Sequence, residues 1–149
     1  MSNQKLITIC IPTYNRSDRV TNLIKTLLSF ELNNEIEILV IDDYSSDNTF
    51  ESLSQFSDLP NVSVHRNQQN LSFARTQLKY FNLCKTEFLV TLADDDYLLK
   101  DGLLELLDLL PKLDVDFLST RWIGPDGSFH QGRGSDKVQD ISLTNLRTS

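Results

Sequence analysis

Three adjacent carboxylates, Asp94–Asp96, form the segment of the sequence with the clearest chemistry, and only Ala93 separates them from the apolar run Phe88–Leu92. Neighbouring carboxylates repel one another unless a cation lies among them, and a hard divalent ion such as Mn²⁺ or Mg²⁺ removes that conflict. Alternate side chains of an extended segment share a face, so Asp94 and Asp96 are expected to bind the ion together. A solvated acidic loop is the alternative.

A second acidic pair, Asp42 and Asp43, follows the apolar run Ile36–Ile41. An ionised carboxylate only accepts hydrogen bonds, which suits a ribose hydroxyl or a base N–H group, and Asp43 is the candidate for that role. An Asx-type turn that caps the next helix explains Asp42–Ser46 equally well.

The first apolar run, Leu6–Ile11, is followed by the polar segment Pro12–Arg16. Tyr14 could stack on or flank a base, and Arg16 could contact a phosphate. Arg75 could add positive charge to the same pocket, although an exposed helical arginine is the ordinary explanation. Taken alone, the first segment is explained more simply by a turn that leads into a helix. It contains no GxGxxG pattern, which argues against a dinucleotide site.

These segments need a scaffold, and apolar runs that alternate with segments of helical period predict a mostly parallel sheet flanked by helices. In such α/β folds, ligands bind beyond the carboxyl ends of the strands, so the polar segments should meet at one edge of the sheet. The expected strands are Leu6–Ile11, Ile36–Ile41, Val62–His65, Phe88–Leu92 and Val115–Thr120.

Four helices are expected between and after these strands, from the spacing of their apolar residues. The first is capped by Ser17, and Pro111 ends the fourth. The apolar positions are Val20, Leu23, Ile24, Leu27 and Leu28 in the first helix, Phe50 and Leu53 in the second, Ala74, Leu78 and Phe81 in the third, and Leu103, Leu106, Leu107 and Leu110 in the fourth.

Length, charge and composition exclude several classes of protein and of site. The chain of 149 residues has the length of one domain, and its net charge of −7 is the wrong sign for a nucleic-acid binder. The cysteines, Cys10 and Cys84, and the histidines, His65 and His130, lack the spacing of a disulfide framework or a zinc site. The apolar run near the N-terminus is too short for a signal peptide or a transmembrane segment, so a cytoplasmic protein is expected.

Four segments together resemble the family 2 glycosyltransferases, which have the Rossmann-like GT-A fold. They occur in the family's order, and they are Ile9–Arg16, Leu39–Asp47, Asn70–Arg75 and Leu92–Asp96. The resemblance implies an inverting transfer of a sugar from a nucleoside diphosphate sugar, with a UDP-sugar as the first candidate, to a saccharide or lipid-linked saccharide. It also suggests cell-surface polysaccharide synthesis, in the cytoplasm or peripherally at the inner face of the membrane.

The resemblance also implies roles for individual residues. The nucleotide pocket would be lined by Pro12, Tyr14, Asp43 and Arg75, and the acidic block would bind Mn²⁺ or Mg²⁺. The common Asp-x-Asp-Asp pattern would need an acid at Ala93, and this sequence resembles the Ser-Asp-Asp-Asp variants instead. The family pattern therefore favours Asp95 as the metal ligand, whereas side-chain alternation favours Asp94 and Asp96.

Family members continue beyond the acidic block through an acceptor-binding half that carries the general base. Only residues 97–149 follow here, and the late candidates of suitable type are Asp126, His130 and Asp136. The sequence therefore predicts a nucleotide-sugar-binding α/β domain over residues 1–123 and a Gly-rich, loop-like tail over residues 124–149. The chain is expected to be truncated after the metal-binding motif and to lack the base.

Three alternatives remain open. The chain could bind a nucleotide sugar without turning it over. A receiver-like signalling domain would also bind Mg²⁺, but it needs an acidic pair after the first strand and a lysine after the fifth, where Pro12–Tyr14 and Thr120–Trp122 stand. A nucleotidyltransferase would need a Gly-rich, lysine-containing loop after its first strand, which is not present.

Overall fold

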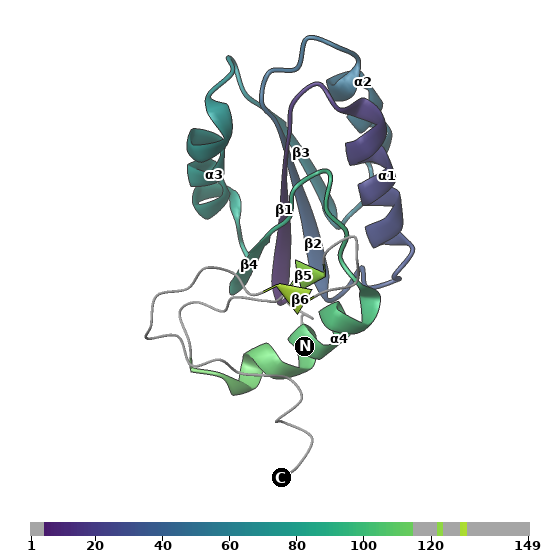
Figure 1. Cartoon of the computed structure of the whole chain (residues 1–149), viewed down its shortest axis with the longest axis vertical. Coiled ribbons are helices and arrows are strands. Elements are labelled where there is room, and N and C mark those ends of the chain that lie inside the picture. Colours follow the sequence, from purple (N-terminus) through teal and green to yellow (C-terminus); the bar gives the residue numbers. More distant parts are fainter. Residues whose placement is uncertain (1–4, 115–121, 124–128, 131–149) are drawn as a thin grey trace. The chain divides into compact units, whose positions relative to one another are not determined.

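A computed structural model describes residues 5–114, 122–123 and 129–130 of the chain (Figure 1). The chain divides into two compact units, residues 1–112 and 113–149. The first unit contains, in order, β1 (Ile7–Thr13), α1 (Ser17–Leu28), β2 (Ile36–Asp42), α2 (Thr49–Leu53), η1 (Ser54–Phe56), β3 (Val62–Arg66), α3 (Ser72–Leu83), β4 (Phe88–Thr91), α4 (Lys100–Leu109) and η2 (Leu110–Lys112). In the second unit, β5 (Trp122–Ile123) pairs antiparallel with β6 (Phe129–His130).

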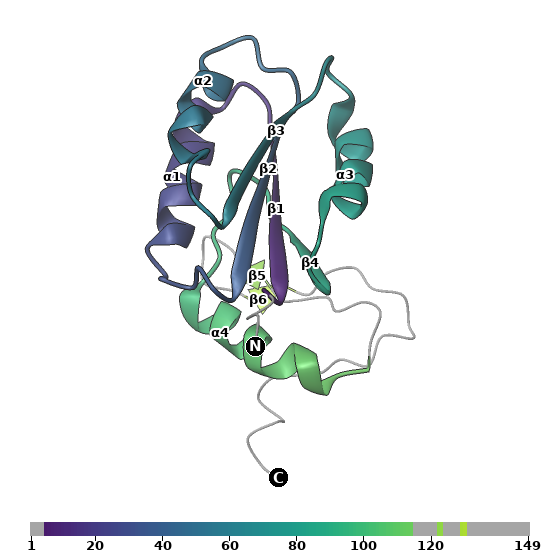
Figure 2. The ribbon, with the colours of Figure 1, turned by 180° about the vertical axis from the view of Figure 1, so that it is seen from behind.

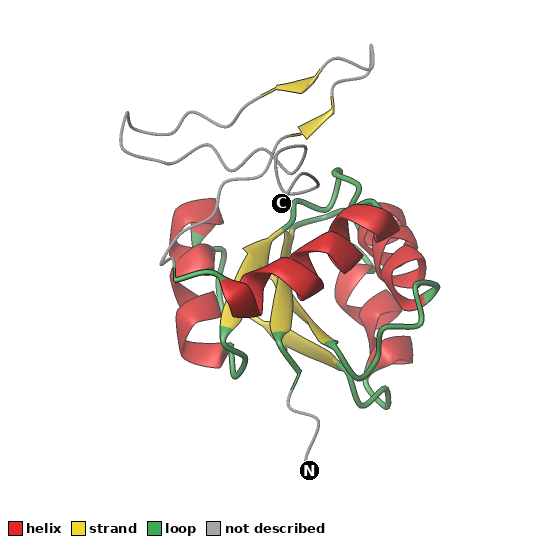
Figure 3. Cartoon of the chain, turned by 90° about the horizontal axis from the view of Figure 1, so that it is seen from below, coloured by secondary structure: helices red, strands yellow, loops and turns green. Residues whose placement is uncertain are grey.

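The first unit is built on a four-stranded parallel sheet of order β3-β2-β1-β4, which Figure 2 shows from behind. Ile7 of β1 pairs with Ile36 of β2 and with Phe88 of β4. Helices cover both faces of the sheet (Figure 3). The predicted parallel α/β fold is confirmed, and its strand order differs from the 2-1-3-4-5 order of receiver domains. The fifth predicted strand, Val115–Thr120, lies outside the described residues.

The core lies between the central strands and α1. The isoleucines of β1 and β2 are buried, as is usual where helices cover both faces of a parallel sheet. The predicted stripe of α1 is also buried, apart from the half-buried Leu28. The predicted cap is wrong: Ser17 is the first helical residue, and its hydroxyl accepts no hydrogen bond from the backbone of α1 but donates to the hydroxyl of Ser52 at 2.8 Å.

α3 packs on the sheet through a different face from the one predicted. Thr76 and Tyr80 are its buried residues, one helical turn apart, whereas Leu78 and Phe81 of the predicted stripe are 65% and 72% exposed. The apolar pattern predicts the wrong face because the buried residues are not aliphatic: Thr76 bonds to Asn67, and Tyr80 packs against β1 and β2.

Candidate functional site

A pocket of about 240 Å³ lies beyond the carboxyl ends of the strands. It brings together five residues predicted for the site, namely Pro12, Tyr14, Arg16, Asp43 and Asp94. Thr13, Phe73, Thr76 and Ala93 complete its lining. Segments from β1, β2, α3 and the turn after β4 therefore form one site, as the parallel sheet requires.

Asp94 is held by two donors from the segment that follows β1. The hydroxyl of Thr13 donates to Oδ2 of Asp94 at 2.8 Å, and Nη1 of Arg16 lies 2.6 Å from Oδ1. The side chain of Asp94 is only 4% exposed. A buried carboxylate needs polar partners, and these two contacts provide them.

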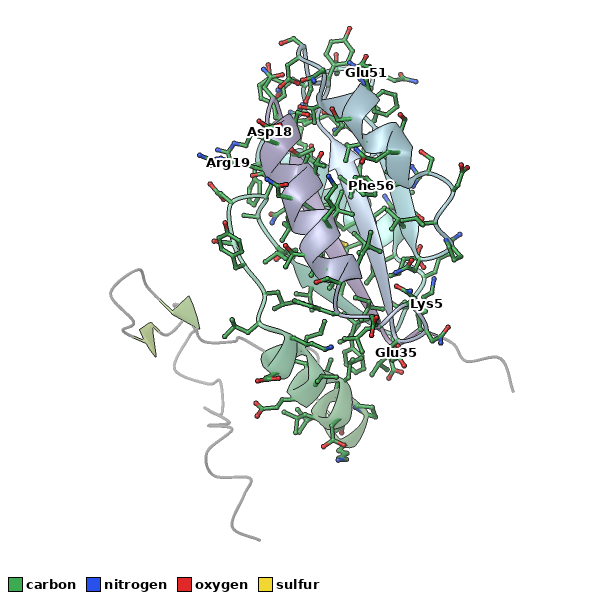
Figure 4. The ribbon with its side chains drawn as sticks, turned by 90° about the vertical axis from the view of Figure 1, so that its right-hand side faces the viewer. Lys5, Asp18, Arg19, Glu35, Glu51 and Phe56 are labelled. Carbon is green, nitrogen blue, oxygen red and sulfur yellow. The ribbon has the colours of Figure 1, made fainter. Side chains whose placement is uncertain are left out.

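Arg16 is shared between two members of the acidic block. Its Nη1 also lies 3.1 Å from Oδ2 of Asp95, and the guanidinium of Arg19 lies 3.5 Å from the same oxygen. Figure 4 shows Arg19 in the first turn of α1, at the opposite end of the unit from Lys5. The hydrogen bond with Asp94 and the attraction of its charge raise the pKa of Arg16. Guanidinium groups therefore compensate the mutual repulsion of these carboxylates.

The geometry of the acidic block differs from the extended segment assumed from the sequence. Asp94 and Asp95 lie in a turn, in which the backbone N–H of Asp96 donates to the carbonyl of Ala93 at 3.1 Å. Side-chain alternation therefore does not apply, and the expectation that Asp94 and Asp96 share a face on that ground is wrong. Within the described part of the chain, no three His, Cys, Asp or Glu side chains cluster as a complete metal-binding group.

Asp43 is anchored through one of its two oxygens. Oδ1 accepts hydrogen bonds from Nδ2 of Asn67 at 2.6 Å and from the backbone N–H of Leu71 at 2.8 Å. No group in residues 5–114 donates to Oδ2. The backbone N–H of Asp43 donates to the carbonyl of Thr13 at 2.8 Å, which joins the ends of β1 and β2. Asp43 is thus oriented by the protein and retains a free acceptor at the pocket.

Asp42 forms a turn, which is the alternative role that the sequence suggests for Asp42–Ser46. Its carboxylate accepts from the backbone N–H of Ser45 at 3.2 and 3.3 Å and from the Ser45 hydroxyl. Nε of Arg66 lies 3.2 Å from Oδ2 of Asp42, whose side chain is fully buried. Asp42 therefore forms the turn, whereas Asp43 lines the pocket. The predicted hydrogen bond from a nucleoside to Asp43 stays a prediction.

The segments after β1 and β2 are also joined directly. Oδ1 of Asn15 accepts from the backbone N–H of Ser46 at 2.8 Å, and the N–H of Asn15 donates to Ser45 Oγ at 2.9 Å. Asn15 has a φ of 52°, a left-handed conformation that asparagine tolerates well. Asn15 thus holds the segments after β1 and β2 together, and the only sequence signal for such a role is its place in the polar segment Pro12–Arg16.

Other predicted site residues lie apart from the pocket lining. Arg75 is an exposed residue of α3, and Asp95 and Asp96 are exposed next to Asp94. Of the late candidates for a base, Asp126 and Asp136 fall outside the described residues, and His130 is described only as part of β6. No helix in the described part of the chain is long and apolar enough to cross a membrane.

Comparison with known proteins gives a consistent result. Residues 8–147 match the model of the family described as "Glycosyl transferase family 2". Over 101 residues, which are 66% of this chain and 30% of the relative, the sequence is 34% identical to the abequosyltransferase RfbV of Salmonella typhimurium. It is 23% identical over 142 residues to the poly(ribitol-phosphate) β-N-acetylglucosaminyltransferase TarS of Staphylococcus aureus, which corresponds to 93% of this chain and 25% of TarS.

Solved structures show the same fold. The structure of S. aureus TarS 1-349 in complex with UDP-GlcNAc matches 72% of this chain and 31% of its own, with a TM-score of 0.65 and 23% identity. The mannosyltransferase PcManGT from Pyrobaculum calidifontis, in complex with GDP-Man and Mn²⁺, matches 78% of this chain and 34% of its own. The TM-score is 0.64 and the identity is 15%. The chain therefore has the GT-A fold. It spans 25% to 30% of the length of the two curated relatives and 31% to 34% of the two solved chains.

Proposed function

The chain belongs to glycosyl transferase family 2, and we propose that it binds the nucleoside diphosphate sugar from which a sugar is transferred, with inversion, to an acceptor hydroxyl. The observation that carries this proposal is one pocket with an oriented carboxylate, Asp43, and a second acidic group, Asp94, among its lining residues. Two of its relatives are sugar transferases, the abequosyltransferase RfbV and the poly(ribitol-phosphate) β-N-acetylglucosaminyltransferase TarS. The proposal includes a saccharide or lipid-linked saccharide as the acceptor and a role in cell-surface polysaccharide synthesis.

The nucleoside would bind near Asp43. The free Oδ2 atom can accept a hydrogen bond from a ribose hydroxyl or a base N–H group. Tyr14 and Phe73, which are 45% and 60% exposed, both line the pocket and offer aromatic surface to a base. UDP is the first candidate because the similar structure of TarS 1-349 is a complex with UDP-GlcNAc. The N–H groups of uracil, thymine and guanine and the amino group of cytosine can all donate to a carboxylate. GDP, dTDP and CDP are the alternatives that an experiment must compare.

The diphosphate and a divalent ion would bind at the acidic block. Oxygens of Asp94 and Asp95 already converge on one positively charged group, Nη1 of Arg16, so the donor set suits a hard cation that completes its shell with water and phosphate oxygens. Mn²⁺ or Mg²⁺ would be held by Asp94 and Asp95, with Asp96 as a further ligand. When bound, the ion would stabilise the negative charge of the departing diphosphate.

The protein's own residues would orient the donor for the displacement. The acceptor oxygen forms a bond to the anomeric carbon as the bond to the diphosphate breaks, and a base removes the proton of the acceptor. Asp43 and Asp94 are both held by protein donors, so neither is assigned as that base. Arg16 and the exposed Arg75 are the guanidinium groups proposed to contact the diphosphate.

Calorimetric titration tests this proposal. UDP, GDP, dTDP and CDP are each titrated with Mn²⁺ and with EDTA into the wild type and into Asp43→Asn, Asp95→Asn and the exposed control Asp58→Asn. We expect one diphosphate to bind best, Asp43→Asn to weaken it by about tenfold with or without metal, and Asp95→Asn to remove the increase due to Mn²⁺. Binding of none of the four would refute the proposal, and binding without turnover would identify a donor-binding module.

A further inference from the structure

Lys79 is connected to the pocket through a buried asparagine. Its Nζ donates to Oδ1 of Asn67 at 2.6 Å, and Asn67 is only 3% exposed. The Nδ2 group of the same amide donates to Oδ1 of Asp43 at 2.6 Å and to the hydroxyl of Thr76 at 3.1 Å. An ammonium group on α3 is therefore joined to the proposed nucleoside-binding carboxylate by a single amide.

The chemistry of its neighbours permits only one orientation of this amide. An ammonium group only donates and an ionised carboxylate only accepts. A reversed amide would place its NH₂ group against Lys79 and its carbonyl oxygen against Asp43, so it would lose both hydrogen bonds and create two repulsive contacts. Lys79 and Asp43 thus fix the amide from opposite sides.

Asn67 is also rigid in its backbone. Asn67 directly follows β3, and its backbone N–H group donates to the carbonyl of Asp42 at 2.8 Å. The main chain of Asn67 is therefore bonded to the last residue of β2, and its side chain to the residue that follows β2. A buried amide with every polar group bonded transmits the position of one partner to the other.

We propose that Lys79 is a positioning residue of the donor site. By fixing the amide of Asn67, it holds Oδ1 of Asp43, so that Oδ2 alone is presented to the nucleoside. Lys79 also brings a positive charge near a carboxylate that is 6% exposed and forms no ion pair in residues 5–114. This inference rests on the proposed function, because it assigns Lys79 to the site that would bind the nucleoside.

The test compares affinities for the diphosphate that the wild type binds best among UDP, GDP, dTDP and CDP. We expect Lys79→Met to weaken binding by about tenfold and Lys79→Arg to recover most of the loss, because a guanidinium also donates to the amide oxygen. Lys85→Met is the matched control, since Lys85 is exposed and makes no contact with the pocket. It should bind as the wild type does.

A double-mutant cycle separates positioning from a general loss of structure. If Lys79 acts through Asp43, the effect of Lys79→Met should nearly disappear in the Asp43→Asn background. A readout without ligand comes from the side-chain amide protons of Asn67 in NMR spectra. We expect them to be protected from exchange in the wild type and to lose that protection in Lys79→Met.

The possible failures are distinguishable. Normal binding by Lys79→Met, equal losses in both backgrounds, or unchanged amide protection would overturn the role of Lys79 while the donor site itself stands. Binding of no diphosphate by the wild type would end both proposals.

Discussion

Arg16 and Asp94 form an ion pair between the segment after β1 and the turn after β4, with Nη1 2.6 Å from Oδ1. The carboxylate is almost fully buried, whereas the arginine side chain is 43% exposed. The guanidinium thus supplies the positive charge that the acidic block needs. This relationship makes Arg16 a competitor of any divalent ion that binds Asp94 and Asp95.

Replacing Arg16 should make the protein more dependent on metal. Arg16→Gln leaves Asp94 with one neutral donor, Thr13. In EDTA we therefore expect the free energy of unfolding to fall by about 1–2 kcal/mol, which is less than for a fully buried pair because Arg16 is partly exposed. Mn²⁺ should restore more stability to this variant than to the wild type. Thermal unfolding with Mn²⁺ and with EDTA measures both effects.

Arg19→Gln is the control for that experiment, because Arg19 is more exposed and, among the described residues, pairs only with Asp95, at 3.5 Å. It should change stability by no more than about 0.5 kcal/mol. An equal response to Mn²⁺ in the wild type and in Arg16→Gln would contradict the competition between Arg16 and the ion.

Arg66 should be essential for the loop that carries Asp43. It pairs with the buried Asp42, donates from Nη2 to the carbonyl of Ser45 at 2.7 Å, and lies 4.8 Å from the ring centre of Phe50. Arg66→Met leaves a buried carboxylate without its cation and should cost about 2–4 kcal/mol. Urea unfolding measures this loss, and adding Asp42→Asn should recover part of it. Full additivity of the two substitutions would show that the pair is not coupled.

Tyr80 offers a stabilising substitution. Its side chain is fully buried, and its hydroxyl has no hydrogen-bond partner among the residues that the structure describes. Because an unsatisfied buried hydroxyl is costly, Tyr80→Phe should raise the free energy of unfolding by about 1 kcal/mol. A rise in the urea midpoint with an unchanged m-value is the expected result. A clear loss of stability would show that the hydroxyl has a partner, such as a buried water.

The parts of the fold that can be predicted from the sequence are those in which a single physical rule determines the local structure. β1 and β2 are mostly apolar because helices cover both faces of the sheet, and α1 has a regular aliphatic stripe. Pro12, Tyr14, Asp43 and Asp94 meet at one pocket because parallel strands end at a common edge.

The parts that do not follow from the sequence depend on contacts between distant polar groups. The ion pairs of Arg16 with Asp94 and Asp95 require the turn after β4, which no local pattern predicts. The sequence likewise gave no signal for the bond between Lys79 and Asn67, because its meaning depends on the position of Asp43. α3 buries the face of Tyr80 and not the predicted one. Because tyrosine is amphipathic, its burial depends on packing with the rest of the fold.

The two cysteines should differ strongly in reactivity. Cys10 is fully buried in β1, and burial, followed by the charges of Cys84 and Glu37, raises its pKa from 9.0 to about 12. The thiolate is the reactive form, so iodoacetamide at pH 8–9 should modify the half-buried Cys84 long before Cys10 in the folded protein. Mass spectrometry of the modified peptides measures both rates.

The same shift predicts how stability depends on alkaline pH. Because the folded state holds the proton of Cys10 more tightly than the unfolded state, its contribution is fully present below pH 9 and is lost as the pH rises toward 12. Cys10→Ala removes this titration, so the unfolding free energy of the variant should fall less steeply between pH 9 and pH 11 than that of the wild type. Below pH 9 the variant should be less stable than the wild type, because the smaller side chain leaves a cavity. Parallel slopes for the two proteins, or equal alkylation rates at Cys10 and Cys84, would show that the thiol of Cys10 is accessible to solvent.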